Sequence, residues 1–147
     1  MSVQLRLATP DDADAIAGVF TASRRLLDFL PQLHTPDEDR GFIGSHVLPR
    51  YRVTVATREA RIVGFLADEP GWIENLYVAP DSLGGGIGSA LLADAKARNG
   101  ALELWCFVEN RRARHFYERH GFAEVLRTDG SGNEERCPDI RFRWHGS

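Results

Sequence analysis

Residues 72–98 read WIENLYVAPDSLGGGIGSALLADAKAR, and this segment carries the strongest structural signal of the sequence. It begins as a strand over Trp72–Val78, turns through a run of glycines at 84–88, and continues with apolar residues at helical spacing. Glycine permits unusual backbone angles and the close approach of a ligand. The first turn of a helix offers free N–H groups and the positive end of a dipole. The stretch therefore predicts a site for an anionic group such as a pyrophosphate.

Two well-known kinds of pyrophosphate site do not match this turn. A Walker A loop needs a Gly-Lys-Ser/Thr sequence, and the turn has no lysine. A dinucleotide fingerprint needs a glycine or alanine three residues after Gly88, where Leu91 stands. That fingerprint also belongs to an early parallel βαβ unit, whereas antiparallel strands are expected here. A glycine-rich turn without a ligand is the remaining structural alternative.

The segments before the turn indicate three antiparallel strands in a meander, at 52–57, 61–67 and 72–78, with a tight turn at 59–60. An earlier strand carries Leu5 and Leu7 on one face. Thr9 and Thr35 each precede a proline and acidic residues, which is the signature of a helix start. Phe42 is expected on the apolar side of the second helix.

The segments after the turn alternate between helix and strand. A helix that starts at the turn is expected to end near 99–100, and Asn110 is expected to cap another. The apolar stripe of that second helix is Ala113, Phe116, Tyr117 and His120. Strands are expected at 102–108, 122–127 and 140–144, with a polar loop before the last. The fold class is therefore α/β (α+β), as one domain over residues 1–147.

Composition narrows the class of protein further. The 147 residues are 43% hydrophobic and carry a formal net charge of −3, so no basic field indicates nucleic acid as a partner. The N-terminus lacks the pattern of a signal peptide, and no apolar run approaches a membrane span. A cytoplasmic protein with no membrane partner is expected. Cys106 is expected in the core and Cys137 in a loop, and no metal site is expected.

The whole pattern resembles the GNAT N-acetyltransferase superfamily over nearly the entire chain. The most specific matches are NLYVAP at 75–80, GGGIG at 84–88, and NRRARHFYERHGF at 110–122. Gly86 and Gly88 match the glycines of the family's acetyl-CoA loop, but Leu83 stands where Gln or Arg is usual. The resemblance implies the GNAT fold: a mixed, mostly antiparallel, twisted sheet of about seven strands flanked by about four helices. It also implies acetyl-CoA as co-substrate.

The resemblance assigns acetyl-CoA to a cleft beside the strand before the turn. The backbone of Leu76, Tyr77 and Val78 is expected to pair with the pantetheine, and an N–H near Val78 to receive the developing oxyanion. The pyrophosphate is expected on the backbone of the turn, with Asn110 as a further contact. The residues of the turn are Gly84, Gly85, Gly86, Ile87, Gly88 and Ser89.

Two residues are expected to move protons. By resemblance, Tyr117 is the general acid that protonates the leaving thiolate, although helical spacing alone indicates a core residue. The acceptor amine must lose a proton before it attacks, and Glu74 is the first candidate for the base. Asp68 and Glu69 come next. A solvent-exposed structural position is the alternative for Glu74.

The expected reaction is direct acetyl transfer to an amine in a ternary complex. A small-molecule amine is the first expectation for the acceptor. A protein or peptide amine, a homodimer and a non-catalytic acyl-CoA-binding module stay open, whereas a nucleotide-phosphate enzyme is disfavoured. The apolar loop at 28–34 and the acidic loop at 129–135 are expected to face each other across the acceptor entrance. His34 is interpreted as a loop residue.

Overall fold

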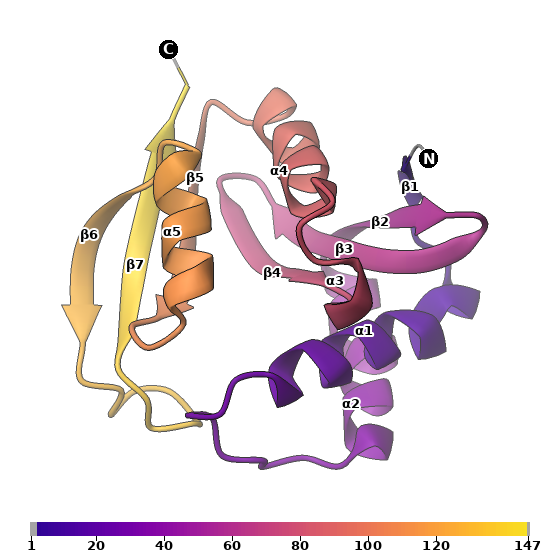
Figure 1. Cartoon of the computed structure of the whole chain (residues 1–147), viewed down its shortest axis with the longest axis horizontal. Coiled ribbons are helices and arrows are strands. Elements are labelled where there is room, and N and C mark those ends of the chain that lie inside the picture. The colour runs from indigo at the N-terminus through magenta and orange to yellow at the C-terminus, as the bar shows by residue number, and fades with distance from the viewer. Residues whose placement is uncertain (1–2, 147) are drawn as a thin grey trace.

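A single mixed sheet forms the centre of the computed structural model, which describes residues 3–146 (Figure 1). The strands are β1 (Gln4–Leu7), β2 (Arg52–Arg58), β3 (Arg61–Glu69), β4 (Trp72–Val78), β5 (Ala101–Phe107), β6 (Ala123–Thr128) and β7 (Asp139–His145). Their order across the sheet is β1-β2-β3-β4-β5-β7-β6. Only β4 and β5 are parallel, so the prediction of a mixed, mostly antiparallel sheet of seven strands is confirmed.

Helices cover both faces of the sheet. They are η1 (Pro10–Asp12), α1 (Ala13–Arg25), α2 (Pro36–Phe42), η2 (Ile43–Val47), α3 (Leu48–Arg50), η3 (Pro80–Ser82), α4 (Ile87–Ala97) and α5 (Arg111–Arg119). Phe65 and Ala67 of β3 pack in one hydrophobic cluster with α1 and η2, whereas Leu66 packs in a second cluster with α4 and α5. Because side chains alternate along a strand, the two helix groups lie on opposite faces.

The two halves of the sheet differ in how they are covered. In each of β2 and β3, every residue except the first and the last is buried, so these two strands have helices over both of their faces. In β5, Leu102, Leu104 and Cys106 are buried while Trp105 is exposed, so only the face toward α4 and α5 is covered. The other face of β5 and β7 has no helix over it among the described residues.

Local signals located most elements correctly. Thr35 starts α2 with a reciprocal capping box to Glu38, and the Asn110 side chain accepts a hydrogen bond from the Ala113 N–H at 3.2 Å. Thr9 precedes a 3₁₀ turn instead of a regular helix start, and α1 begins one turn later. Glu59 and Ala60 form the tight turn in left-handed conformations.

Some apolar residues are more exposed than their neighbours in the sequence suggest. Leu7 is 53% exposed on β1, which is an edge strand. Phe42 is 38% exposed at the end of α2, where it lies against the ring of Phe20. Of the stripe predicted for α5, only Tyr117 is buried. No helix within residues 3–146 has the length and apolar character needed to cross a membrane.

Candidate active site

A gap opens in the sheet where β4 and β5 diverge (Figure 1). Among the described residues, the two strands pair only at Trp72 and Glu103. The Ala79 N–H donates to the Val63 carbonyl at 2.8 Å, which makes Val78 and its partner on β3 a non-hydrogen-bonded pair. The N–H and C=O of Val78 therefore point away from β3, and those of Leu76 two residues earlier do the same. The backbone groups of Leu76 and the N–H of Val78 open onto the gap, whereas the Val78 carbonyl accepts a hydrogen bond from the Ser23 hydroxyl.

The end of α1 holds β4 at this gap. The Ser23 hydroxyl donates to the Val78 carbonyl at 2.9 Å, and an Arg24 guanidinium N–H donates to the Tyr77 hydroxyl at 3.3 Å. The Tyr77 ring packs against Phe20, so its side chain lies on the α1 face of the sheet. Of the three residues predicted to line the pantetheine, Tyr77 presents neither its ring nor its backbone polar groups to the gap, because it lies between Leu76 and Val78 and its N–H and C=O face Phe65 of β3. Its ring is part of the α1 cluster.

The predicted glycine turn lies at the start of α4, on the face opposite α1. Gly84 and Gly86 have φ values of +83° and +80°, a region that glycine occupies without strain. A Cβ on either would meet no atom within 4 Å, so both face open space. The Ile87 side chain is 1% exposed and belongs to the core. Ile87 can therefore serve a ligand only through its backbone.

The end of the glycine turn contacts α5 instead of solvent. A Cβ on Gly88 would lie 3.3 Å from the Phe116 ring, so glycine allows the two helices to approach here. The Ser89 hydroxyl lies 3.1 Å from Nε2 of His120. Asn110 uses its side-chain oxygen to cap α5, as expected from the sequence.

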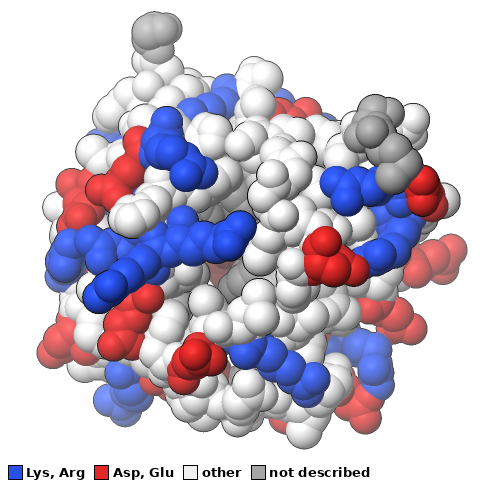
Figure 2. Space-filling view, in the orientation of Figure 1, with Lys and Arg blue, Asp and Glu red and all other residues white. Residues whose placement is uncertain are grey.

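Positive charge gathers beside the turn. Helix α5 carries four arginines, Arg111, Arg112, Arg114 and Arg119, against one acidic residue. Figure 2 shows Lys and Arg side chains over the region of α5, reaching the edge of a hollow near the middle of this face. Sequence reasoning did not use this feature, although the arginine run was its signal. Such a surface suits a ligand that carries several phosphates.

Tyr117 is buried on the α5 face, with 8% of its surface exposed. Its ring packs edge-on against Phe122, at 5.5 Å between centroids, within the second hydrophobic cluster. Burial is the main cause that raises the pKa of the Tyr117 phenol well above its usual range. The hydroxyl therefore stays protonated at any physiological pH, which is the form that a proton donor needs.

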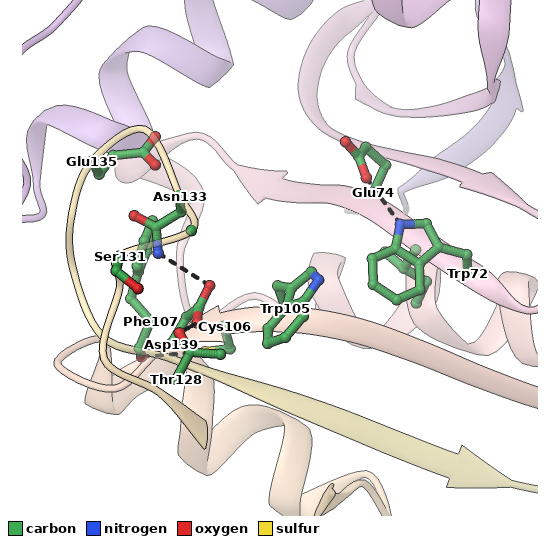
Figure 3. A pocket seen from close by; sticks show the side chains of 12 residues that line it. Trp72, Glu74, Trp105, Cys106, Phe107, Thr128, Ser131, Asn133, Glu135 and Asp139 are labelled. Carbon is green, nitrogen blue, oxygen red and sulfur yellow. Dashed lines mark hydrogen bonds between the residues drawn. The ribbon is translucent and has the colours of Figure 1, made fainter. Parts of the chain in front are cut away.

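A cavity of about 580 Å³ lies on the other face of the sheet, between β4, β5 and the loop before β7 (Figure 3). Its lining residues are Trp72, Ile73, Glu74, Trp105, Cys106, Phe107, Thr128, Ser131, Gly132, Asn133, Glu135 and Asp139. The Glu74 carboxylate accepts a hydrogen bond from the Trp72 indole N–H at 2.9 Å. This is the one candidate base from the sequence that lines the cavity.

A β-bulge places Glu74 on the cavity side. Asp68 pairs with Ile73 and Ala67 pairs with Asn75, so Glu74 is the extra residue on β4. Without the bulge, strand alternation would put Glu74 on the same face as Leu76, which packs toward α4 and α5. The backbone irregularity therefore allows one strand to present apolar residues to one face and a carboxylate to the other.

The other two candidate bases lie away from the cavity. Asp68 is 3% exposed and forms an ion pair with Arg98 at 2.7 Å, and Glu69 lies 3.8 Å from Arg50. Burial raises the pKa of Asp68, while Arg98 partly offsets that effect. Asp68 is thus held in a structural ion pair.

Neither cysteine is placed for nucleophilic catalysis. Cys106 is buried as predicted, and burial raises the pKa of its thiol to about 12, so the thiolate needed for attack is absent at neutral pH. Cys137 lies in the loop before β7, also as predicted, and burial raises the pKa of its thiol too. Among residues 3–146, no group of His, Cys, Asp and Glu has the geometry to hold a metal ion.

The two loops expected to face each other are in direct contact. His34 of the first loop pairs with Glu134 of the second, while Arg24 of α1 pairs with Glu135 at 2.8 Å and Phe29 packs edge-on against Phe107 of β5. The pair of His34 with Glu134 is the contact between the two loops. The two loops therefore lie against each other as expected, and only the second of them lines the cavity, so an acceptor entrance between them stays a prediction.

The comparison with known families identifies the class of this protein. A family model described as an acetyltransferase (GNAT) domain matches residues 49–124, slightly more than half of the chain. That match spans the glycine turn and both strands of the gap. The chain therefore belongs to the GNAT acetyltransferase family, as the sequence resemblance implied.

Two relatives carry the name of uncharacterized N-acetyltransferase. One, from Archaeoglobus fulgidus, is 28% identical over 148 residues, which cover 90% of this chain and 100% of that protein. The other, from Methanocaldococcus jannaschii, is 40% identical over 78 residues, covering 42% of this chain. The match spans only 34% of that relative's length.

Solved structures agree on the fold. YjaB from Escherichia coli, in its apo form, superposes with a TM-score of 0.83 at 22% identity, and each chain is covered completely. The PaiA N-acetyltransferase from Thermoplasma acidophilum, solved in complex with coenzyme A, gives a TM-score of 0.74 at 17% identity, with 99% of each chain covered. At these identities the likeness concerns the fold alone.

Proposed function

We propose that this chain is an acetyl-CoA-dependent N-acetyltransferase that passes the acetyl group directly to a small-molecule amine. The observation that carries the proposal is the gap at β4, where the backbone groups of Leu76 and the N–H of Val78 face no neighbouring strand and lie between two different surfaces. The glycine turn and the arginines of α5 lie on one face, and the acidic, aromatic cavity lies on the other. A donor and an acceptor could therefore reach the same strand from opposite faces.

The residues around the turn fit coenzyme A. Its pyrophosphate would accept hydrogen bonds from the N–H groups at the start of α4, where Gly84 and Gly86 leave the backbone open. The arginines of α5 would balance the phosphate charge. The amide groups of the pantetheine arm would pair with the backbone of Leu76, which opens onto the gap and leaves the Val78 N–H for the thioester oxygen. The Thermoplasma relative with bound coenzyme A supports this choice of ligand.

The chain offers a group for each proton and charge in the transfer. Glu74 takes the proton from the acceptor ammonium, directly or through water, so that the neutral amine can attack the thioester carbon. The Val78 N–H donates to the oxygen as negative charge develops on it. Tyr117 gives its phenolic proton to the sulfur as the C–S bond breaks. Cys106, held as a neutral thiol, takes no part.

The first experiment tests whether turnover occurs at all. A panel of primary amines is incubated with the protein and acetyl-CoA, and release of free thiol is measured together with the mass of the acetylated product. Thiol release that requires an amine, with matching acetylated product, supports the proposal. Binding of acetyl-CoA without product from any amine would instead indicate the non-catalytic acyl-CoA-binding module.

The second experiment tests the location of the coenzyme A site. Gly86→Leu places a side chain in the cradle and should abolish coenzyme A binding, measured by calorimetry. Gly71→Leu is the matched control because Gly71 has a φ of +77° and equally open surroundings, but lies in the turn before β4. Both variants bear a similar backbone strain, so equal coenzyme A binding by the two would contradict the assigned cradle.

A further inference from the structure

We propose that the acceptor is an arylalkylamine without an acidic group, recognised by the tryptophans and carboxylates of the cavity on the β5 face. This inference rests on the proposed function and names the substrate class of that same site. It depends on three observations, which are the exposed aromatic surface, the balance of charge, and the size of the cavity.

The aromatic surface is the first observation. Trp105 is 43% exposed although its neighbours on β5 are buried, and it lies on the sheet face that no described helix covers. Figure 3 shows the Trp105 ring between Trp72 on one side and Asp139 on the other. Exposed indole rings bind flat apolar groups by stacking and attract cations to their faces. A ligand with an aromatic body and a cationic end suits this surface.

The balance of charge is the second observation. The lining holds three carboxylates and no lysine, arginine or histidine. Two of the carboxylates have partners, since Glu135 pairs with Arg24 and Asp139 accepts hydrogen bonds from Thr128 and Asn133. Within residues 3–146, Glu74 has no ion-pair partner and accepts a hydrogen bond from the Trp72 indole. It is therefore the carboxylate left to receive an incoming ammonium group.

The same balance disfavours acceptors that carry an acid. An amino acid would bring its own carboxylate into a cavity that has three already and no cation in its lining. Like charges in such a site repel each other, and the ligand's carboxylate would lose water without gaining a partner. The cavity thus selects against an α-amino acid and in favour of the amine that lacks its carboxyl group.

The size of the cavity is the third observation. A volume of about 580 Å³ lies within the range of about 300–1,000 Å³ typical of sites for small organic ligands. Two lining residues on one side are held from outside the cavity, since Phe107 packs against Phe29 and Glu135 pairs with Arg24 of α1. A compact amine with one aromatic ring would fill such a space.

Three matched substrates test the charge argument. 2-Phenylethylamine, phenylalaninamide and phenylalanine share a ring and a primary amine, and only phenylalanine carries a carboxylate. We expect kcat/KM about 100-fold lower for phenylalanine than for 2-phenylethylamine or phenylalaninamide, which carry no carboxylate. Acetylation of phenylalanine with equal or higher kcat/KM would overturn the inference and leave the proposed acetyltransferase function intact.

A variant tests the aromatic argument. Trp105→Leu should raise KM for 2-phenylethylamine about fivefold and leave KM for acetyl-CoA unchanged. Trp144→Leu is the control, because Trp144 packs against Gly121 and Lys96 outside the cavity. An unchanged KM for 2-phenylethylamine in Trp105→Leu would show that Trp105 does not contact the acceptor amine.

A binding measurement covers the case in which turnover is too slow to follow. Quenching of tryptophan fluorescence should give a tighter Kd for 2-phenylethylamine than for phenylalanine, and Trp105→Leu should weaken the binding of both while leaving the difference between them. Tighter binding of phenylalanine would overturn the inference whether or not any amine is acetylated.

Discussion

The two halves of the sheet differ in how many faces of their strands are buried. In the half formed by β1–β4, the central strands are buried on both faces, and Phe65, Val55 and Ala56 have no exposed surface. In the half formed by β5, β7 and β6, buried residues alternate with exposed ones, and β6 is exposed over most of its length. The gap lies where the two halves meet.

The difference indicates a division between stability and ligand recognition. A strand that is buried on both faces offers a large apolar contact area but little room for chemistry. An uncovered face leaves Trp105 and its neighbours free for a ligand, at the cost of less apolar burial in that half. Substitutions in the two halves should therefore have separable effects on stability and on turnover.

The largest expected effect concerns turnover alone. Tyr117→Phe keeps the ring in its cluster and removes the hydroxyl, so turnover should fall by roughly 10²–10⁴ while Tm changes little. Single-turnover thiol release, with coenzyme A binding measured in parallel, checks this. If turnover is unchanged while chemistry is shown to be rate-limiting, Tyr117 has a packing role in the core and no role as the general acid.

The largest expected effect on stability lies in the covered half. Phe65→Ala should lower the free energy of unfolding by about 3–5 kcal/mol, because the ring is fully buried and a cavity would remain. Val125→Ala on β6 is the control, since Val125 is 52% exposed and its loss should change stability by about 0.5 kcal/mol or less. Urea unfolding of both variants measures the difference. Similar losses in the two would contradict the comparison of the halves.

A smaller effect is expected where α1 meets the gap. Ser23→Ala removes the hydrogen bond to the Val78 carbonyl, which contributes about 1 kcal/mol. Because this hydrogen bond orients the peptide of Val78 in the proposed site, its loss should lower kcat about fivefold. KM for acetyl-CoA should change less than kcat. Ser23→Thr retains a hydroxyl and should restore most of the rate. A fall in Tm with no change in kcat would show that Ser23 stabilises the fold only.

The smallest expected effect is a pH dependence at the edge of the covered half. Arg6 on β1 hydrogen-bonds the Asp12 carboxylate and lowers its pKa to about 2. A carboxyl group whose pKa is lowered by folding stabilises the protein above its unfolded pKa of about 4, and that contribution disappears as pH falls toward 2. Because Arg6 is exposed to solvent, we expect about 1 kcal/mol or less. Asp12→Asn should therefore be less stable at pH 7 but equal to the unmodified chain near pH 2, as measured by urea unfolding.

The sequence predicted the features that depend on neighbouring residues. The glycine turn, the Thr35 and Asn110 caps and the strand positions all follow from signals within a few residues. The cavity-side contacts could not be predicted in this way. The Ser23 contact with Val78 joins residues 55 apart, and the Arg24 pair with Glu135 joins residues 111 apart. Such contacts depend on how the elements pack, for which a single sequence gives no local signal.

The aromatic cavity shows both the reach and the limit of sequence reasoning. The alternation of Leu104, Trp105 and Cys106 was enough to place Cys106 in the core, and it also implied that Trp105 points the other way. Whether a helix covers that other face was not readable from the strand. The bulge at Glu74 had no signal either, yet it determines which face the carboxylate occupies.

The single residue pair between β4 and β5 has a consequence for backbone amide exchange. Leu76 and Val78 lie in the interior of a seven-stranded sheet, but their N–H groups open onto the gap instead of a neighbouring strand. Their amides should exchange with deuterium as quickly as those of an edge strand, in contrast to the protected amides of β3. A ligand that accepts hydrogen bonds from these two groups would slow their exchange selectively. Two amide signals would thus report occupancy of the gap without any enzymatic assay.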